Sequence, residues 1–248
     1  MFGPFMKKTL LVAAVALSSV AVAEQPQRSE PPARIDVQQL TKQAGVVDNV
    51  VVPLPSEIFQ VLDKLGNKPS WADVLRPVKA RPTGDKEQTA LLLGTVIAEG
   101  FVAVEAENAA EVKNIGNTVR NLAKAMGVEK AVIKRANAII ETADKKEWMQ
   151  VRKELDGALF DVKTAMIELN SEPLSQLVSL GGWLRGTEAL TTVVQRTYTK
   201  DGAGLLHQPV LVDHFDRRIE AMEGRMKNQP LVARVRKGLV EIRPDDAK

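Results

Sequence analysis

The chain contains no cysteine among its 248 residues. This absence excludes a disulfide framework, thiol catalysis, iron–sulfur clusters, c-type haem attachment and thiolate zinc sites. Histidine is almost as scarce, since His207 and His214 are the only two. On one helix they would stand roughly 10 Å apart, and metal bonds of about 2 Å do not span that distance. The sequence therefore predicts no metal site, no cofactor and no histidine-based catalytic triad.

Aromatic residues and surplus positive charge are also scarce. Aromatic residues make up 4% of the chain, and its formal net charge is +3. Residues 1–23 hold two of the 34 Lys and Arg residues and none of the 31 Asp and Glu residues, so their removal lowers the net charge to +1. Nucleic-acid-binding proteins usually carry a marked Lys and Arg surplus with aromatic side chains for base stacking. We therefore expect no nucleic-acid partner.

The first 23 residues have the order of a secretory signal peptide. Lys7 and Lys8 form a cationic start, Thr9–Val20 is apolar, and a small-x-small sequence ends at Ala23. The apolar run is shorter than the roughly 20 residues that span a bilayer stably. We expect cleavage after Ala23, a periplasmic or secreted product, and no transmembrane span after processing.

Two segments with little periodicity follow. Residues 24–34 contain three prolines and almost no apolar side chain, which is typical of a flexible tether. Residues 35–84 are expected to hold short helices and loops, with caps at Ser56 and Ser70. Within them, the β-branched run 46–55 is limited to an extended segment or edge strand by its prolines.

The longest helical signal runs from residue 85 to residue 126. One apolar seam keeps the helical period throughout and is interrupted only at Asn108. The seam consists of Leu91, Gly94, Ile97, Phe101, Val104, Val112, Ile115, Val119, Leu122 and Met126. An unbroken helix would be about 60 Å long, whereas a compact globule of this size is about 45 Å across. Either the helix breaks, or the protein is an elongated bundle.

Three glycines inside this segment, Gly94, Gly100 and Gly116, each disfavour a helix by about 0.8 to 1 kcal/mol relative to alanine. We interpret them as points where a neighbouring helix approaches closely.

Three further helical patterns cover 129–142, 144–169 and 171–198. Their short connections favour antiparallel neighbours, so an antiparallel four-helix bundle is predicted over 85–199. Residues 200–206 are predicted as a loop. Two proline-initiated helices then complete a C-terminal helical hairpin within 200–248. The predicted fold class is all-α.

Glu99 is the first candidate site residue. The sequence around it is apolar on nearly every face, which is typical of a buried helix. A buried carboxylate needs a partner or a polar cavity. We therefore expect Glu99 either to be paired with a cation or a backbone donor, or to anchor a ligand.

Arg185 and Trp183 are the other candidate ligand-binding residues. Helix rise along an unbroken first helix places Arg185 near Leu122, about 30 Å from Glu99. We therefore expect Arg185 either to contact Glu188 at i+3 or to cap the end of a neighbouring helix. Only a break in the long helix would bring Arg185 to Glu99. Trp183 lies among glycines, a pattern that favours tight packing around a large ring over a binding platform.

These patterns lead to three functional hypotheses. The preferred one is an exported, non-enzymatic interaction or scaffold protein of the bacterial cell envelope that binds a protein partner. The first alternative is a carrier of a small apolar or amphipathic ligand held between helices near Glu99 or Trp183. The second is a carboxylate-dependent enzyme, although no catalytic residue is assigned. An apolar cavity with Glu99 or Arg185 at its wall would favour the carrier.

Overall fold

The computed structural model describes residues 46–47, 50–51, 57 and 70–243. This part of the chain is overwhelmingly helical, which confirms the all-α class. A minimal antiparallel ladder pairs β1 (Val46–Val47) with β2 (Val50–Val51). The predicted signal peptide and tether lie outside the described residues, as does nearly all of the helix predicted to start at Ser56.

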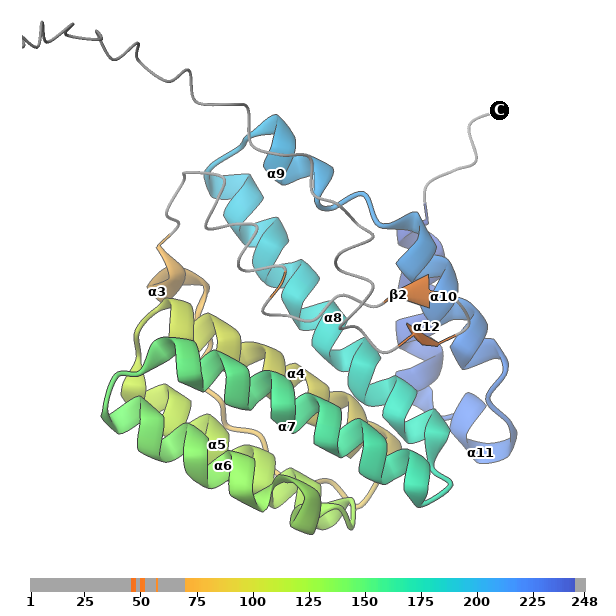
Figure 1. Ribbon diagram of the computed structural model, residues 1–248. Coiled ribbons are helices and arrows are strands. Elements are labelled where there is room, and N and C mark those ends of the chain that lie inside the picture. Colours follow the sequence, from red (N-terminus) through yellow and green to blue (C-terminus); the bar gives the residue numbers. More distant parts are fainter. Residues whose placement is uncertain (1–45, 48–49, 52–56, 58–69, 244–248) are drawn as a thin grey trace, which may run out of the picture. The chain divides into compact units, whose positions relative to one another are not determined.

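Six helices fill the first part of the described chain (Figure 1). They are α3 (Trp71–Val74), α4 (Lys86–Glu105), α5 (Ala109–Ala125), α6 (Glu129–Asp144), α7 (Trp148–Glu168) and α8 (Glu172–Arg196). Four more helices follow them. These are α9 (Lys200–Gly204), α10 (Pro209–Glu220), α11 (Gly224–Lys227) and α12 (Pro230–Ile242).

The segment 85–126 is not one helix, because it breaks between α4 and α5. Glu107 adopts a left-handed conformation with φ of 51°, and the amide of Asn108 returns to the carbonyl oxygen of Ala103 at 2.9 Å. The side chain of Asn108 then caps α5 by accepting from the amide of Glu111 at 3.0 Å. The range 85–199 consequently holds five long helices where the sequence predicted four.

The same type of connection recurs three times. Gly127, Lys146 and Asn170 each have a positive φ in the middle of a three-residue link between consecutive helices. In each link the following amide bonds back to a carbonyl five residues earlier, which satisfies a free carbonyl at the helix end. The backbone therefore ends α5, α6 and α7. The side-chain cap predicted at Ser70 does not form at the start of α3, and α7 and α8 also begin without a side-chain cap.

Helix α4 lies at the centre of the packing and contacts α5, α7 and α8. Its contact with α8 is the most extensive, and there the two backbones meet. A Cβ atom on Gly94 would overlap the carbonyl oxygen of Val178, and one on Gly181 would overlap that of Leu91. Gly100 and Gly116 similarly face side chains of α7 and α6. The prediction that these glycines mark close helix contacts is confirmed.

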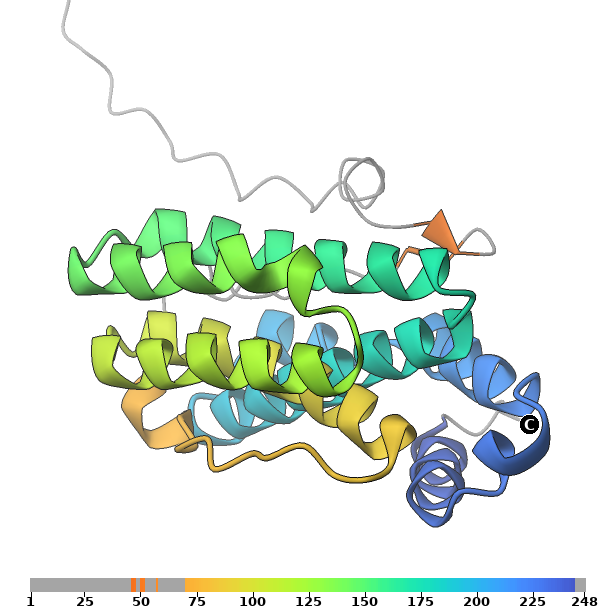
Figure 2. The ribbon, with the colours of Figure 1, turned by 90° about the horizontal axis from the view of Figure 1, so that it is seen from below.

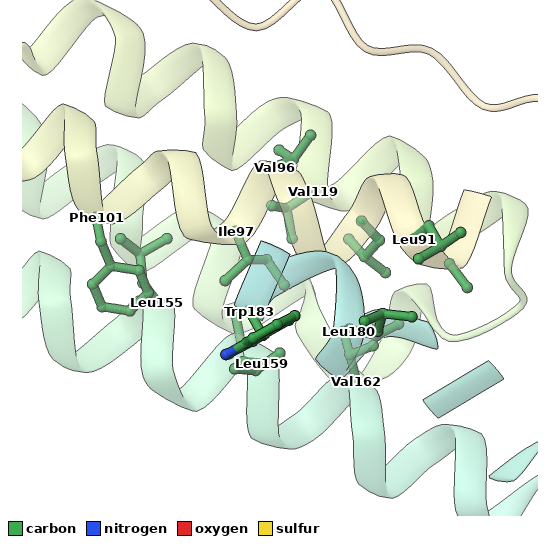
Figure 3. Close-up of a cluster of buried hydrophobic side chains, with 14 of the residues drawn as sticks. Leu91, Val96, Ile97, Phe101, Val119, Leu155, Leu159, Val162, Leu180 and Trp183 are labelled. Atoms are coloured by element: carbon green, nitrogen blue, oxygen red, sulfur yellow. The ribbon is translucent and has the colours of Figure 1, made fainter. Parts of the chain in front are cut away.

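All ten seam residues are buried. Figure 3 shows Trp183 among aliphatic side chains that include Ile97 from α4 and Leu159 from α7. Within the described part, α4 is the one helix long and apolar enough to cross a membrane, and 78% of its most apolar window is buried inside the molecule. Such burial is typical of the core helix of a folded protein.

The two C-terminal helices predicted from their prolines are present as α10 and α12, and they contact each other. The loop predicted for 200–206 is wrong over its first five residues, which form α9. Helix α9 is stabilised by an N-cap, because the Thr199 hydroxyl accepts a hydrogen bond from the amide of Gly202 at 3.0 Å.

Candidate functional site

Residues 75–84, which we call the strap, connect α3 to α4 and run back along α4 (Figure 2). Side chains hold the strap backbone in place. The amide of Arg76 donates to Glu99 Oε1 at 2.6 Å, and the amide of Val78 donates to Glu111 Oε1 at 2.6 Å. Asn114 Nδ2 donates to the Val78 carbonyl oxygen at 2.9 Å. These bonds replace the partners that a neighbouring strand would supply.

Glu99 and Arg185 form a buried ion pair beneath the strap. Each side chain is 4% exposed. Arg185 Nε donates to Glu99 Oε2, and an Arg185 terminal nitrogen, Nη2, donates to the carbonyl oxygen of Val74 at 2.9 Å. Both carboxylate oxygens of Glu99 are thus occupied, one by Arg185 and the other by the Arg76 amide.

This pairing corrects the prediction that the two residues lie about 30 Å apart. Helix α4 ends only six residues beyond Glu99. Residues 85–126 therefore do not form one continuous helix, and helix rise along them cannot be used to place Arg185 relative to Glu99. Gly94 and Gly182 meet where α4 and α8 approach each other. Glu99 and Arg185 follow these glycines by five and three residues, which brings them to the same level.

Glu188 joins the buried pair to the surface. Its Oε2 lies 3.6 Å from Arg185 Nη1, which confirms the predicted i+3 contact. The same oxygen accepts from Arg76 Nη1 at 2.8 Å. Because Arg76 and Glu188 are both substantially exposed, this outer pair contributes less than about 1 kcal/mol.

A hollow of about 490 Å³, which we call the strap hollow, lies between the strap, α4 and α8. It is lined by Arg76, Pro77, Val78, Lys79, Ala80, Leu92, Thr95, Val96, Glu99, Leu184, Arg185 and Glu188. Its wall therefore combines aliphatic side chains with the charged network described above. Sequence reasoning missed the strap residues of this site, because no helical or strand period marks the run between Leu75 and Gly84.

Trp183 is separate from this hollow. The side chain is buried in the core, its Nε1 donates to Gln208 Oε1 at 2.7 Å, and its ring lies 5.2 Å from that of Phe215. The structure thus brings Glu99 and Arg185 together and places Trp183 elsewhere, where it links α8 to α10. Tight packing around this ring is the arrangement that the sequence favoured.

The buried acids elsewhere are held by arginines. Asp216 accepts from Arg236 at 2.8 Å and from Arg243 at 2.8 Å. Burial raises the pKa of Asp216, but the hydrogen bonds and charges of the two arginines outweigh it and hold the pKa below its ordinary value. Glu154 likewise pairs with Arg135 at 3.0 Å. These carboxylates are engaged as ion-pair partners.

No group of three or more His, Cys, Asp or Glu side chains within the described residues is placed to hold a metal ion. His207 precedes α10, whereas His214 is buried within that helix and packs edge-on against Phe215 at 5.3 Å between ring centroids.

A second surface feature is the outward side of α7. Met149, Phe160 and Ile167 are 73%, 64% and 54% exposed. Their spacings of 11 and 7 residues correspond to about three and two helical turns, so the three side chains share one side of the helix. We call this surface the α7 face.

Comparison of the chain with protein-family models, with curated proteins and with solved structures finds no match.

Proposed function

We propose that this chain is an exported, non-enzymatic helical interaction module of the bacterial cell envelope, and that the α7 face is its contact surface for a protein partner. The export step rests on the signal-peptide order of residues 1–23. The proposed interaction rests on the exposed apolar side chains of the α7 face.

The α7 face carries three large, exposed apolar side chains along one side of a single helix, about 16 Å and 10 Å apart by helix rise. The opposite side of the same helix packs in the core, since Val151, Leu155 and Val162 are completely buried. Met149, Phe160 and Ile167 therefore add nothing to the core contacts of α7. An aligned set of exposed apolar side chains is typical of a protein interaction site.

The state of the buried acids supports a role without catalysis. A general base needs a free lone pair within reach of a substrate proton. Both oxygens of Glu99 already accept hydrogen bonds, and Asp216 and Glu154 are held by arginines. These contacts hold the three carboxylates in place as hydrogen-bond and ion-pair partners, which favours a structural role over proton transfer.

The architecture that we propose for this module is an antiparallel bundle of the consecutive helices α4 to α8, with α10 and α12 as a C-terminal hairpin. The three-residue links support the reversals, because each leaves too little chain for neighbouring helices to run in the same direction. In this arrangement α7 has one side in the bundle and presents the α7 face outward.

The test compares two triple variants in envelope extracts. Met149→Ser, Phe160→Ser and Ile167→Ser together remove the α7 face. The matched control changes Tyr198, Val210 and Ile242 to serine, because these side chains are also more than half exposed but lie outside α7. We expect the wild type and the control to migrate in one discrete complex on size exclusion, and the α7 variant to migrate as a free chain with unchanged helicity. Identical migration of all three would contradict the proposal.

A second candidate function is a carrier, which the strap hollow favours. Its volume of about 490 Å³ lies within the usual range of ligand sites, and Glu99 and Arg185 both stand at its wall.

A further inference from the structure

We infer that the strap hollow binds one amphipathic molecule that carries a single negative charge, with its apolar part against α4 and α8 and its anionic head beside Arg76, Lys79 and Arg185. The inference rests on the carrier function and does not depend on the α7 face.

The apolar part of the site is built from both helices. Leu92 and Val96 come from α4 and Leu184 comes from α8, and Pro77 and Ala80 of the strap face the same space. A site lined mainly by aliphatic groups, with a few polar groups at one side, is the common design for an amphipathic ligand.

The charges around the hollow select the sign of the head group. Three cations, Arg76, Lys79 and Arg185, face two carboxylates, Glu99 and Glu188, which leaves one positive charge uncompensated. Glu188 is shared between two arginines. Within the part of the chain that the structure describes, no carboxylate pairs with Lys79. A monoanion would balance this group, whereas a cation would add to its repulsion.

Arg185 gives the head group a fixed anchor. Its Nε and Nη2 atoms donate to Glu99 and to the Val74 carbonyl oxygen, while Nη1 forms an ion pair with Glu188 at 3.6 Å. The guanidinium is held by two bonds in a buried setting, so it loses little side-chain freedom when an anionic head group lies beside it. A carboxylate head group beside Nη1 would share the positive charge of Arg185 with Glu188.

Isothermal titration calorimetry of the exported chain with sodium decanoate, below its micelle concentration and at pH 7.5, tests the inference. We expect saturable binding of one decanoate per chain. Decan-1-ol and decyltrimethylammonium have the same chain without the negative charge, and we expect each to bind at least tenfold more weakly.

Two variants locate the site. Lys79→Glu reverses the unpaired charge and is expected to weaken decanoate binding at least tenfold. Lys237→Glu makes the same change in a second basic hollow between α11 and α12, and is expected to leave the affinity unchanged. Leu92→Trp fills the strap hollow and is expected to abolish binding while circular dichroism stays the same. Equal affinity in the Lys79 and Lys237 variants, or equal binding of decan-1-ol, would overturn the inference.

The anionic amphiphile could be a free molecule or part of a bilayer, and flotation with phosphatidylglycerol vesicles separates the two. We expect the chain to remain with the soluble fraction. Flotation of the wild type together with absent decanoate binding would replace the free ligand with a lipid surface and overturn the inference. Lys79→Glu should leave migration of the α7-dependent complex unchanged, so failure here is distinct from failure of the proposed interaction.

Discussion

At the scale of single residues, Glu99 shows how an acid is kept inside an apolar helix. Removing a carboxylate from water costs several kcal/mol, and only close partners offset that cost. Glu99 has two partners for this purpose, the Arg185 guanidinium and the Arg76 amide, and Arg185 in turn donates to the Val74 carbonyl oxygen. The pair therefore fastens α3 and the strap to the contact between α4 and α8.

Glu99→Gln is expected to lower the free energy of unfolding by about 3 kcal/mol, because it leaves the Arg185 charge buried without its counterion. Urea unfolding followed by circular dichroism measures this change. The control Glu188→Gln removes a half-exposed carboxylate of the same network and should cost less than about 1 kcal/mol. Equal stability of Glu99→Gln and wild type would show that the pair does not hold the strap.

Asp216 makes stability depend on acid pH. Arg236 and Arg243 hold its folded pKa below the ordinary value of 3.8, so its stabilising effect is complete above about pH 4 and is lost as pH falls through the folded pKa. Asp216→Asn should therefore cost about 1 to 3 kcal/mol at neutral pH and progressively less below about pH 4. Urea unfolding between about pH 2 and pH 7 measures this, and a constant difference between variant and wild type would contradict the account.

At the scale of elements, the sequence predicted which faces are buried but missed where one helix ends. The seam from Leu91 to Met126 continues across the break because α4 and α5 turn their apolar faces into the same core. Periodicity therefore stays in phase through residues 106–108. The local signal was the spacing of Asn108 and Glu111, which is that of a capping box. The proline-initiated helices α10 and α12 were predictable, because proline fits only the first turn of a helix.

Two glycine-to-alanine changes in helices are expected to act in opposite directions. Gly94→Ala forces a methyl group into the backbone of α8 and should destabilise the fold by about 3 kcal/mol or more. Gly238→Ala in α12 meets no atom within 4 Å and should stabilise it by up to about 1 kcal/mol. Thermal unfolding of both variants checks the pair, and similar melting temperatures would show that α4 and α8 are not in backbone contact.

At the scale of the whole molecule, the candidate site depends on chain reversals that a single sequence does not display. The burial of Glu99 and its need for a partner followed from the apolar residues around it. The sequence did not predict Arg185 as this partner, because the pairing depends on which turns of α4 pack against which turns of α8. The position of the strap could not be predicted for the same reason. Its hydrogen bonds join residues that are 33 and 36 positions apart, from Val78 to Glu111 and to Asn114.

Export is expected to yield a chain that starts at Glu24. Ala23→Phe should block cleavage, since signal peptidase requires a small side chain there, whereas Ala13→Val inside the apolar run should be processed normally. Intact-mass measurement on the envelope fraction distinguishes the two products. A full-length chain found in the cytoplasm would rule out the proposed location.

The most direct test of the central claim, that the α7 face contacts a protein partner in the envelope, is site-specific photocrosslinking in living cells. A photoreactive amino acid at position 160 lies on that face, and one at position 137 occupies an exposed place on α6. We predict one discrete crosslinked product from position 160 and none from position 137. No product at position 160, or the same product from both positions, would contradict the account.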